Sequence, residues 1–266
     1  MIGLFYSPLD PASLNMAEYI KKEYGFEEKE YKGRICFSNG KICIYKTEKP
    51  LVEMEEADAY DLSIACFLSK HSSAQGIASF TTHSMGNWTN EAKLGGKPYE
   101  LSSSAPLEML ETLRNIKKME QKGVEVSYEA THHGPLLKTP SLFAEVGGNQ
   151  ETVENKEYAK IVADSLYDAL MSDKIDYSKI AIGIGSNHYP SKFSNLALEK
   201  GYAFAYIMPK HAIEEKASNA FMLEQAIERS SKKIELAVID WKSINSEKRN
   251  LIISKLNELG VDYERV

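Results

Sequence analysis

The second half of the chain alternates between short apolar segments with strand character and longer segments with helical periodicity. The predicted strands lie at residues 180–184, 203–207 and 235–239, and the helices that follow them at about residues 192–200, 219–229 and 247–259. Two parallel strands need a long crossover connection, usually a helix, so this order favours parallel pairing. We therefore predict an α/β fold of three layers (α/β/α), in which helices cover both faces of a mostly parallel, mixed sheet.

The first half contains elements of the same two kinds, together with a hairpin and a long loop. Strands are predicted at residues 2–6, 61–68, 77–82, 124–128 and 141–146, and helices at about residues 10–24, 105–122 and 151–171. Asn39-Gly40 is a strong two-residue turn signal and predicts a hairpin at about residues 34–46. Residues 46–59 are charged and are predicted as a surface loop, whereas the loop at about 84–104 has a length typical of functional loops. The 266 residues fit a single α/β domain, 1–266.

The formal net charge of the chain is −6, and Lys and Arg are spread rather than clustered. This balance argues against a protein that coats duplex nucleic acid, but it is compatible with an enzyme that grips one end of an RNA. No apolar run reaches the roughly 18 residues of a membrane span, and no basic region precedes the apolar N-terminus, so we expect a cytoplasmic protein without membrane contact. Cys36 and Cys43 flank the hairpin turn and are predicted to face each other across it. In the cytoplasm, free thiols are favoured over a disulfide between these two cysteines.

All six histidines of the chain lie just beyond the predicted end of a strand. They are His71, His83, His132, His133, His188 and His211. If the strands are parallel, these ends gather along one rim of the sheet, where ligands bind in α/β folds. Glu145 lies in a predicted apolar strand, and a buried Glu is rare unless it is paired or binds a metal. We therefore predict an active site on this rim.

Three chemistries could use such a site. A zinc site needs neutral imidazoles and a carboxylate, with one position left open for a water molecule that the metal activates. Metal-free hydrolysis would use a histidine as general base, oriented by Glu129 or Glu145. An anion could also bind at Gly147-Gly148 or at residues 183–185, although such glycines more often form tight turns. The residues alone indicate a hydrolase or a transferase, without its substrate.

Six segments of the chain resemble, in matching order, the archaeal and plant type of D-aminoacyl-tRNA deacylase. They are SKHSS (69–73), THSMGNW (82–88), YEATHHGP (128–135), TPSLFAEVG (139–147), NHYP (187–190) and MPKH (208–211). The resemblance implies a zinc-dependent esterase, with one or two zinc ions, that releases D-amino acids from tRNA in translation quality control. It also implies a monomer with an α/β fold similar to those of peptidyl-tRNA hydrolase and the nucleoside phosphorylases.

On this resemblance we expect catalysis by four residues, which hold zinc or position the attacking water: His132, His133, Glu145 and His188. The expected metal ligands are the same four residues and His83, and His71 and His83 are candidates for proton transfer or a second metal ion. The expected substrate contacts are Lys70, His71, Trp88, Glu129, Gly147, Tyr189, Lys210 and His211. Lys70 and Lys210 would meet phosphates of the tRNA acceptor end, and Trp88 or Tyr189 could stack on its terminal adenine. The plainer interpretation is that the two lysines are ordinary surface charges and that the two aromatic side chains pack in the core.

Two other classes of protein remain as alternatives. One is a nucleoside phosphorylase or an amidohydrolase-like enzyme on a related fold, and the other is a non-catalytic RNA-binding protein. A phosphorylase would need phosphate and would not depend on tRNA. We expect the deacylase to distinguish D from L substrates by shape, with a pocket in which the wrong enantiomer clashes.

Overall fold

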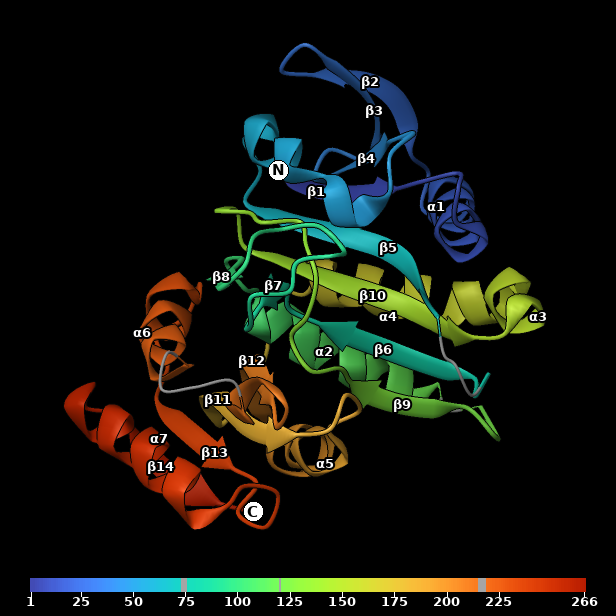
Figure 1. Cartoon of the computed structure of the whole chain (residues 1–266). Helices are drawn as coiled ribbons and strands as arrows, with labels where there is room; N and C mark the ends of the chain where they lie inside the picture. The colour runs from blue at the N-terminus through green and yellow to red at the C-terminus, as the bar shows by residue number, and fades with distance from the viewer. Residues whose placement is uncertain (73–75, 120, 215–218) are drawn as a thin grey trace.

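The structure is a computed structural model that describes residues 1–72, 76–119, 121–214 and 219–266 (Figure 1). Its helices are α1 (Pro11–Glu23), α2 (Pro106–Lys118), α3 (Gln150–Glu154), α4 (Lys156–Met171), α5 (Ser191–Lys200), α6 (Asn219–Arg229) and α7 (Ser246–Glu258), with 3-10 turns η1 (Leu51–Glu53), η2 (Glu55–Tyr60) and η3 (Ala212–Glu214). Its strands are β1 (Ile2–Tyr6), β2 (Glu27–Tyr31), β3 (Arg34–Ser38), β4 (Ile42–Lys46), β5 (Ile64–Ser72), β6 (Ser79–His83), β7 (Gly86–Asn87), β8 (Glu100–Leu101), β9 (Glu125–Tyr128), β10 (Ser141–Gly148), β11 (Lys179–Ser186), β12 (Tyr202–Pro209), β13 (Leu236–Ile239) and β14 (Asp262–Arg265).

These strands form two main sheets. The larger has the order β2-β3-β4-β1-β5-β10-β6-β9, and the smaller has the order β12-β11-β13-β14 with every pair parallel. In the larger sheet β4, β1, β5 and β10 are parallel, but β6 runs antiparallel to β10, and β9 is parallel to β6. The predicted α/β fold with mostly parallel, mixed pairing is confirmed, but the strands are divided between two sheets and do not form one.

The two faces of the larger sheet are covered differently. Alternate residues of a strand point to opposite faces, so Leu4 and Leu142 face one side while Phe5, Phe67 and Phe143 face the other. Leu4 and Leu142 pack in the main core with residues of α1, α2 and α4. Phe5, Phe67 and Phe143 form a second core beneath η1, η2 and nearby loops. The candidate site residues described below lie on this second face.

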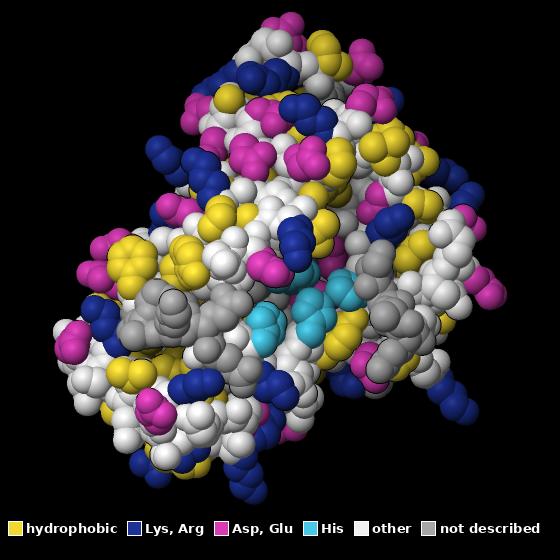
Figure 2. All heavy atoms as spheres, viewed as in Figure 1, with side chains coloured by type: hydrophobic (Ala, Val, Ile, Leu, Met, Phe, Trp, Pro, Cys, Tyr) yellow, Lys and Arg dark blue, Asp and Glu magenta, His cyan; other side chains and the backbone are white. Residues whose placement is uncertain are grey.

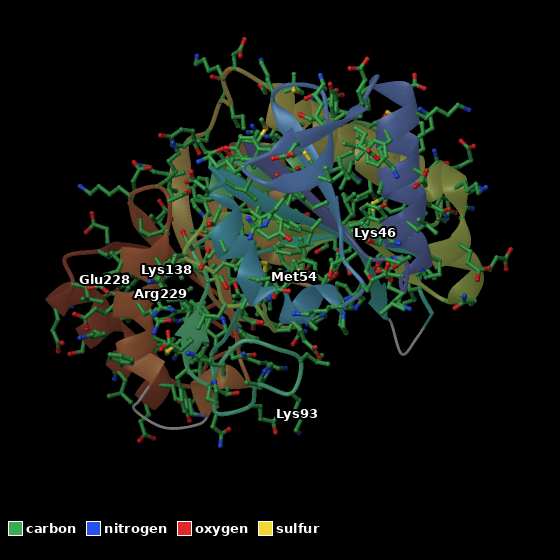
Figure 3. All side chains as sticks on the ribbon, turned by 90° about the horizontal axis from the view of Figure 1, so that it is seen from above. Lys46, Met54, Lys93, Lys138, Glu228 and Arg229 are labelled. Carbon is green, nitrogen blue, oxygen red and sulfur yellow. The ribbon has the colours of Figure 1, made fainter. Side chains whose placement is uncertain are left out.

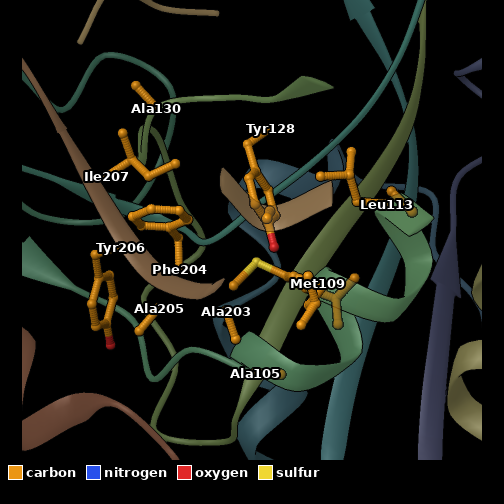
Figure 4. Close-up of a cluster of buried hydrophobic side chains, with 14 of the residues drawn as sticks. Ala105, Met109, Leu113, Tyr128, Ala130, Ala203, Phe204, Ala205, Tyr206 and Ile207 are labelled. Atoms are coloured by element: carbon orange, nitrogen blue, oxygen red, sulfur yellow. The ribbon is translucent and has the colours of Figure 1, made fainter. Parts of the chain in front are cut away.

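Helix α2 lies between the two sheets. It contacts β6 and β9 of the larger sheet and β12 of the smaller one. Figure 4 shows Met109 and Leu113 of α2 grouped with Tyr128 of β9 and Phe204 of β12, and all four side chains are buried. This packing brings the carboxyl ends of β11 and β12 close to the end of β9.

Several local predictions are corrected by the structure. The predicted surface loop at 46–59 contains η1 and η2, and its apolar residues Leu51, Met54 and Ala57 are buried. The predicted helix at 151–171 is two helices, α3 and α4, because Asn155 is extended and caps α4 by accepting hydrogen bonds from two backbone N–H groups. The predicted helix at 105–122 ends at Lys118, and residue 120 lies outside the described residues. The strands β2 and β14 were not predicted, because their sequences are mostly charged and exposed, as is common at sheet edges.

The hairpin of β3 and β4 forms as predicted, but its register differs from the expected one. Ser38, not Cys36, pairs with Cys43, so the two cysteines lie diagonally across the strands. Both are buried free thiols, as expected. Among the residues that the structure describes, no helix has the length and apolar character needed to cross a membrane.

Candidate active site

Three rows of side chains cross β5, β10 and β6 on the second face of the larger sheet. The strand pairing gives the rows Phe67–Phe143–His83, Ser69–Glu145–Thr81 and His71–Gly147–Ser79. His71, His83 and Glu145 therefore share one face, with Glu145 in the middle row. The predicted location on a rim is wrong, because β6 and β9 run opposite to β5 and β10 and their carboxyl ends lie at the other edge. The histidines meet over the face of the sheet.

The segment after β9 brings further histidines to this face. Tyr128 points into the main core, so the next residue, Glu129, points to the opposite face. The N–H groups of Ala130 and Thr131 then donate to the carbonyl oxygens of His188 and Ile207, at 2.8 and 2.9 Å. This segment thus joins the larger sheet to the carboxyl ends of β11 and β12.

The turn that follows places His132 and His133 above the sheet. His133 has a φ of 45°, in the left-handed region that is strained for most side chains. Gly134 lies against the loop of residues 84–104, since a Cβ at this position would be 2.3 Å from the backbone nitrogen of Gly96. The turn is therefore held in place by the loop that covers it.

Two buried carboxylates organise the histidines. Glu129 Oε2 lies 2.8 Å from His188 Nε2, 3.0 Å from His71 Nδ1 and 3.7 Å from His132 Nε2. Glu145 Oε2 lies 3.5 Å from His83 Nε2 and 3.6 Å from His71 Nδ1. Glu129 and Glu145 are only 1% and 2% exposed. In Figure 2 histidine side chains line a hollow in the surface, and acidic side chains lie beside them.

Backbone carbonyl groups fix the orientation of three of the imidazoles. The Nδ1 atoms of His83, His132 and His133 lie 3.1, 2.8 and 2.6 Å from the carbonyl oxygens of Ser84, Ala130 and Gly134. A carbonyl oxygen can only accept a hydrogen bond, so each Nδ1 carries a hydrogen and donates it. Metal-binding histidines are commonly held in this way, with the other ring nitrogen directed at the metal.

The acids and histidines shift one another's pKa values. Burial alone would raise the pKa of Glu145, but contacts with His71 and His83 outweigh it and lower the pKa to about 2. Burial likewise opposes ionisation of Glu129, yet contacts with His188 and His71 hold its pKa well below the usual value. Burial favours a neutral His71, but the two carboxylates raise its pKa to about 10. These shifts favour ionised acids and a protonated His71 at neutral pH.

His132 and His133 have the opposite electrostatic character. Burial, with the neighbouring His133 and His83, lowers the pKa of His132 well below its usual value. Burial, with the charge of His83, lowers the pKa of His133 to about 4. Both imidazoles are therefore neutral at physiological pH, which is the form that binds metals.

The donor atoms fit a metal ion. Three groups have ligand atoms that all lie within 4.8 Å of one another: His71, Glu129, His132 and His188; His83, His132 and His133; and His83, Glu129 and Glu145. Four tetrahedral zinc ligands at about 2.0–2.1 Å from the metal would be about 3.4 Å apart, close to several of these separations. Among the described residues, Glu129 Oε1 is buried without a hydrogen-bond partner, and Glu145 Oε2 has only the long contacts to His83 Nε2 and His71 Nδ1, at 3.5 and 3.6 Å. Such atoms are expected where a cation supplies the partner.

Glu129 was predicted as a substrate contact, but it belongs to two of these three groups. The sequence contains a signal for this position. Val124 and Tyr128 mark the face of β9 that turns into the core, so an acid directly after Tyr128 must lie on the other face. His71, also predicted as a substrate contact, lies between the two carboxylates.

The other predicted substrate contacts are distributed around the cluster. Trp88 and His211 line a cavity of about 170 Å³ together with His132 and His188. Trp88 is only 3% exposed and packs edge-on against Tyr206, so its ring faces lie within the protein. Tyr189 lies beside the cluster, with its ring centre 5.6 Å from that of His71.

Lys70, Lys210 and Gly147 have different surroundings. Lys70 follows the alternation of β5, so its side chain lies on the face opposite His71, and its backbone N–H donates to Asp10. The structure therefore separates Lys70 from the histidines. Lys210 is exposed after β12, and Gly147 lies within the rows described above. Ser73, the last residue of the 69–73 segment, lies outside the described residues.

A larger cavity, of about 670 Å³, lies away from the histidine cluster. Its lining includes Lys138, Glu228 and Arg229, which lie near one another in Figure 3. One of its acids, Asp58, already accepts hydrogen bonds from the backbone N–H groups of Lys138 and Thr139. The converging imidazoles and buried carboxylates are at the histidine cluster, whereas the described lining of this cavity includes no histidine.

Residues 58–264 match the family model described as D-aminoacyl-tRNA deacylase. The chain belongs to this family. It is 34% identical to the D-aminoacyl-tRNA deacylase of Pyrococcus furiosus, and the match covers 96% of each chain. It is 33% identical to the enzyme of the same name from Thermococcus kodakarensis, over 97% of each chain, and 33% identical to that of Methanococcus maripaludis strain C7, over 98% of this chain and 97% of that one.

The fold of this deacylase-family chain also has a solved counterpart. The crystal structure of the conserved protein of unknown function AF0625 superimposes with a TM-score of 0.91 at 28% identity, over 100% of this chain and 95% of that one. The predicted family is confirmed, and with it the class of enzyme, a hydrolase of carboxylic ester bonds.

Proposed function

We propose that this chain hydrolyses the ester bond of D-aminoacyl-tRNA and releases free tRNA and the D-amino acid. Membership of the deacylase family supports the substrate class. The observation that carries the chemistry is the convergence of five imidazoles on two buried carboxylates. Ester hydrolysis needs an activated water and a path for the proton to the leaving ribose hydroxyl, and the cluster has groups for both tasks.

We further propose that the site works with zinc. Glu129, His132 and His188 would hold one ion, with a position left open for water, and His83 and Glu145 would hold a second ion with Glu129 shared. A bound zinc ion lowers the pKa of its water to about 7 and so supplies a nucleophile at neutral pH. For His132 the lone pair would come from a neutral imidazole whose Nδ1–H group is bound to the backbone, whereas contacts with the carboxylates raise the pKa of His83, which would give up its Nε2 proton on binding an ion.

The remaining residues of the cluster would orient the substrate and move protons. His71 holds a proton at Nδ1 between Glu129 and Glu145, from which it can be passed to the leaving ribose hydroxyl. The 170 Å³ cavity beside His132 and His188 has room for one ring-sized group of the substrate. A wall of fixed backbone around such a cavity can exclude one enantiomer by shape.

The test is to incubate the chain with D-tyrosyl-tRNA and L-tyrosyl-tRNA, with and without a chelator. We expect release of D-tyrosine only, its loss on chelation and its recovery when zinc is added back. Equal hydrolysis of both enantiomers would refute the chiral selectivity. Hydrolysis that continues after complete removal of metal would refute the role of zinc while leaving the deacylase activity intact. No turnover of the tRNA, but cleavage of a nucleoside in the presence of phosphate, would indicate the phosphorylase alternative.

A further inference from the structure

Two buried hydroxyl groups on β6 have no hydrogen-bond partner in the part of the chain that the structure describes. Thr81 and Ser79 are 0% and 2% exposed. Neither side-chain oxygen has a hydrogen-bond partner among the described residues. Thr82 lies between Thr81 and His83 in β6, so its side chain points to the face opposite theirs. Its hydroxyl donates to the carbonyl oxygen of Phe143, at 2.7 Å. The unpaired hydroxyls therefore lie on the same face as the histidines and carboxylates.

Thr81 lies directly opposite Glu145. The two residues are partners in the antiparallel pairing of β6 and β10. Side chains of such partners have Cβ atoms about 4.5–5.5 Å apart, within reach of a hydroxyl–carboxylate hydrogen bond. Glu145 Oε2 is buried, and its contacts with His83 Nε2 and His71 Nδ1, at 3.5 and 3.6 Å, are longer than good hydrogen bonds. A hydroxyl without a partner among the described residues and a carboxylate oxygen that can accept a further hydrogen bond therefore occupy neighbouring positions in one row.

The adjacent row makes room for the second hydroxyl. A Cβ at position 147 would lie 2.2 Å from Ser79 Oγ, so only a glycine at this position leaves space for that hydroxyl. Burying an unpaired hydroxyl destabilises a folded protein, and valine at position 81 would fill the same volume without this cost. A hydroxyl buried here, directly opposite an acid of the cluster and without another partner among the described residues, points to a role toward that acid.

We propose that Thr81 is a positioning residue for Glu145. With Glu145 and His83 holding an ion, the Thr81 hydroxyl would donate to the Glu145 carboxylate and fix its orientation. Hydrogen bonds of this kind, made to a metal ligand from behind, typically alter metal affinity by about 10- to 100-fold. The inference rests on the proposed zinc site and assigns a role to a residue outside it.

The test compares three variants with the wild-type chain. Thr81→Val removes the hydroxyl at nearly constant volume, Thr81→Ser keeps it, and Thr82→Val removes the satisfied hydroxyl on the opposite face. Zinc affinity is measured by competition with a chromogenic chelator, and thermal unfolding is measured on the metal-free proteins. We expect Thr81→Val to bind zinc about tenfold or more weakly while its metal-free form unfolds at an equal or higher temperature. Thr81→Ser should restore the affinity, and Thr82→Val should lower the unfolding temperature without weakening zinc binding.

This combination separates positioning from ordinary structural support, which would lower stability and affinity together. If Thr81→Val binds zinc as tightly as the wild-type chain, the inference is wrong although the zinc site stands. If Thr81→Val loses stability as Thr82→Val does, the hydroxyl has a structural role instead. If the wild-type chain binds no zinc, both the proposed metal site and this inference fail.

Discussion

Replacing Glu129 by Gln should weaken zinc binding strongly, because it removes one charge and leaves the shape of the side chain unchanged. Glu129 Oε2 lies within 2.8, 3.0 and 3.7 Å of three histidine nitrogens, and the residue is 1% exposed. Loss of one partner from a buried ionic group typically costs about 3–5 kcal/mol, because the remaining charge is left uncompensated. At about 1.4 kcal/mol for each factor of ten, this corresponds to roughly 10²- to 10⁴-fold weaker binding of zinc.

The assay is chelator competition for zinc, together with the rate of D-tyrosyl-tRNA hydrolysis at matched zinc concentrations. Glu108→Gln is the control, since it removes a carboxylate that is half-buried and belongs to α2, on the opposite face of the sheet. We expect this control to keep the zinc affinity of the wild-type chain. If Glu129→Gln binds zinc as tightly as the control does, Glu129 is not a ligand and the shared-carboxylate arrangement must be abandoned.

Three further predictions follow from positions described above. Gly147→Ala should destabilise the protein by about 1–3 kcal/mol in urea unfolding, because its Cβ would meet Ser79 Oγ at 2.2 Å, and adding Ser79→Ala should recover part of the loss. Lys70→Ala should leave KM for the tRNA unchanged, because that side chain lies on the face opposite the site; a raised KM would contradict this placement. Burial opposes protonation of His71, but contacts with Glu129 and the second carboxylate raise its pKa from 6.5 to about 10. The protonated His71 therefore contributes its full stabilisation below pH 6.5, and this contribution is lost as the pH rises through 10. Chemical denaturation of the metal-free protein should show a free energy of unfolding that falls over this pH range. In the Glu129→Gln variant the fall should be smaller.

The sequence predicted those features that depend on a pattern within one helix or strand. Alternating strands and helices predicted the fold class, because hydrophobic periodicity reports directly which face of an element is buried. The position of Glu145 in an apolar strand marked it as a site residue for a similar reason. Strands β2 and β14 were not predicted, because edge strands can carry charges on both faces and so lack an apolar alternation in their sequence.

The direction of β6 could not be read from its own residues. A strand reads alike in either direction, and its orientation is set by how the following loop and α2 pack between the two sheets. This is why the histidines were expected at a rim and are found over a face. Their convergence was nonetheless predictable in part. His83 lies at the end of β6, and His132 and His133 follow the end of β9. In the sheet β6 lies beside β10, and β9 lies beside β6. The role of Glu129 required both the strand alternation and the position of the segment that follows it.

The short segment at Ala130 and Thr131, hydrogen-bonded to the ends of β11 and β12, has a consequence for when the enzyme becomes competent. His188 follows β11 of the smaller sheet, so a nascent chain of residues 1–180 would still lack one wall of the candidate active site. A zinc ion shared between donors from both sheets would also act as a clamp, because any ligand bound only by the docked form shifts the equilibrium toward it. Metal loading would then report the completion of folding as well as readiness for the reaction.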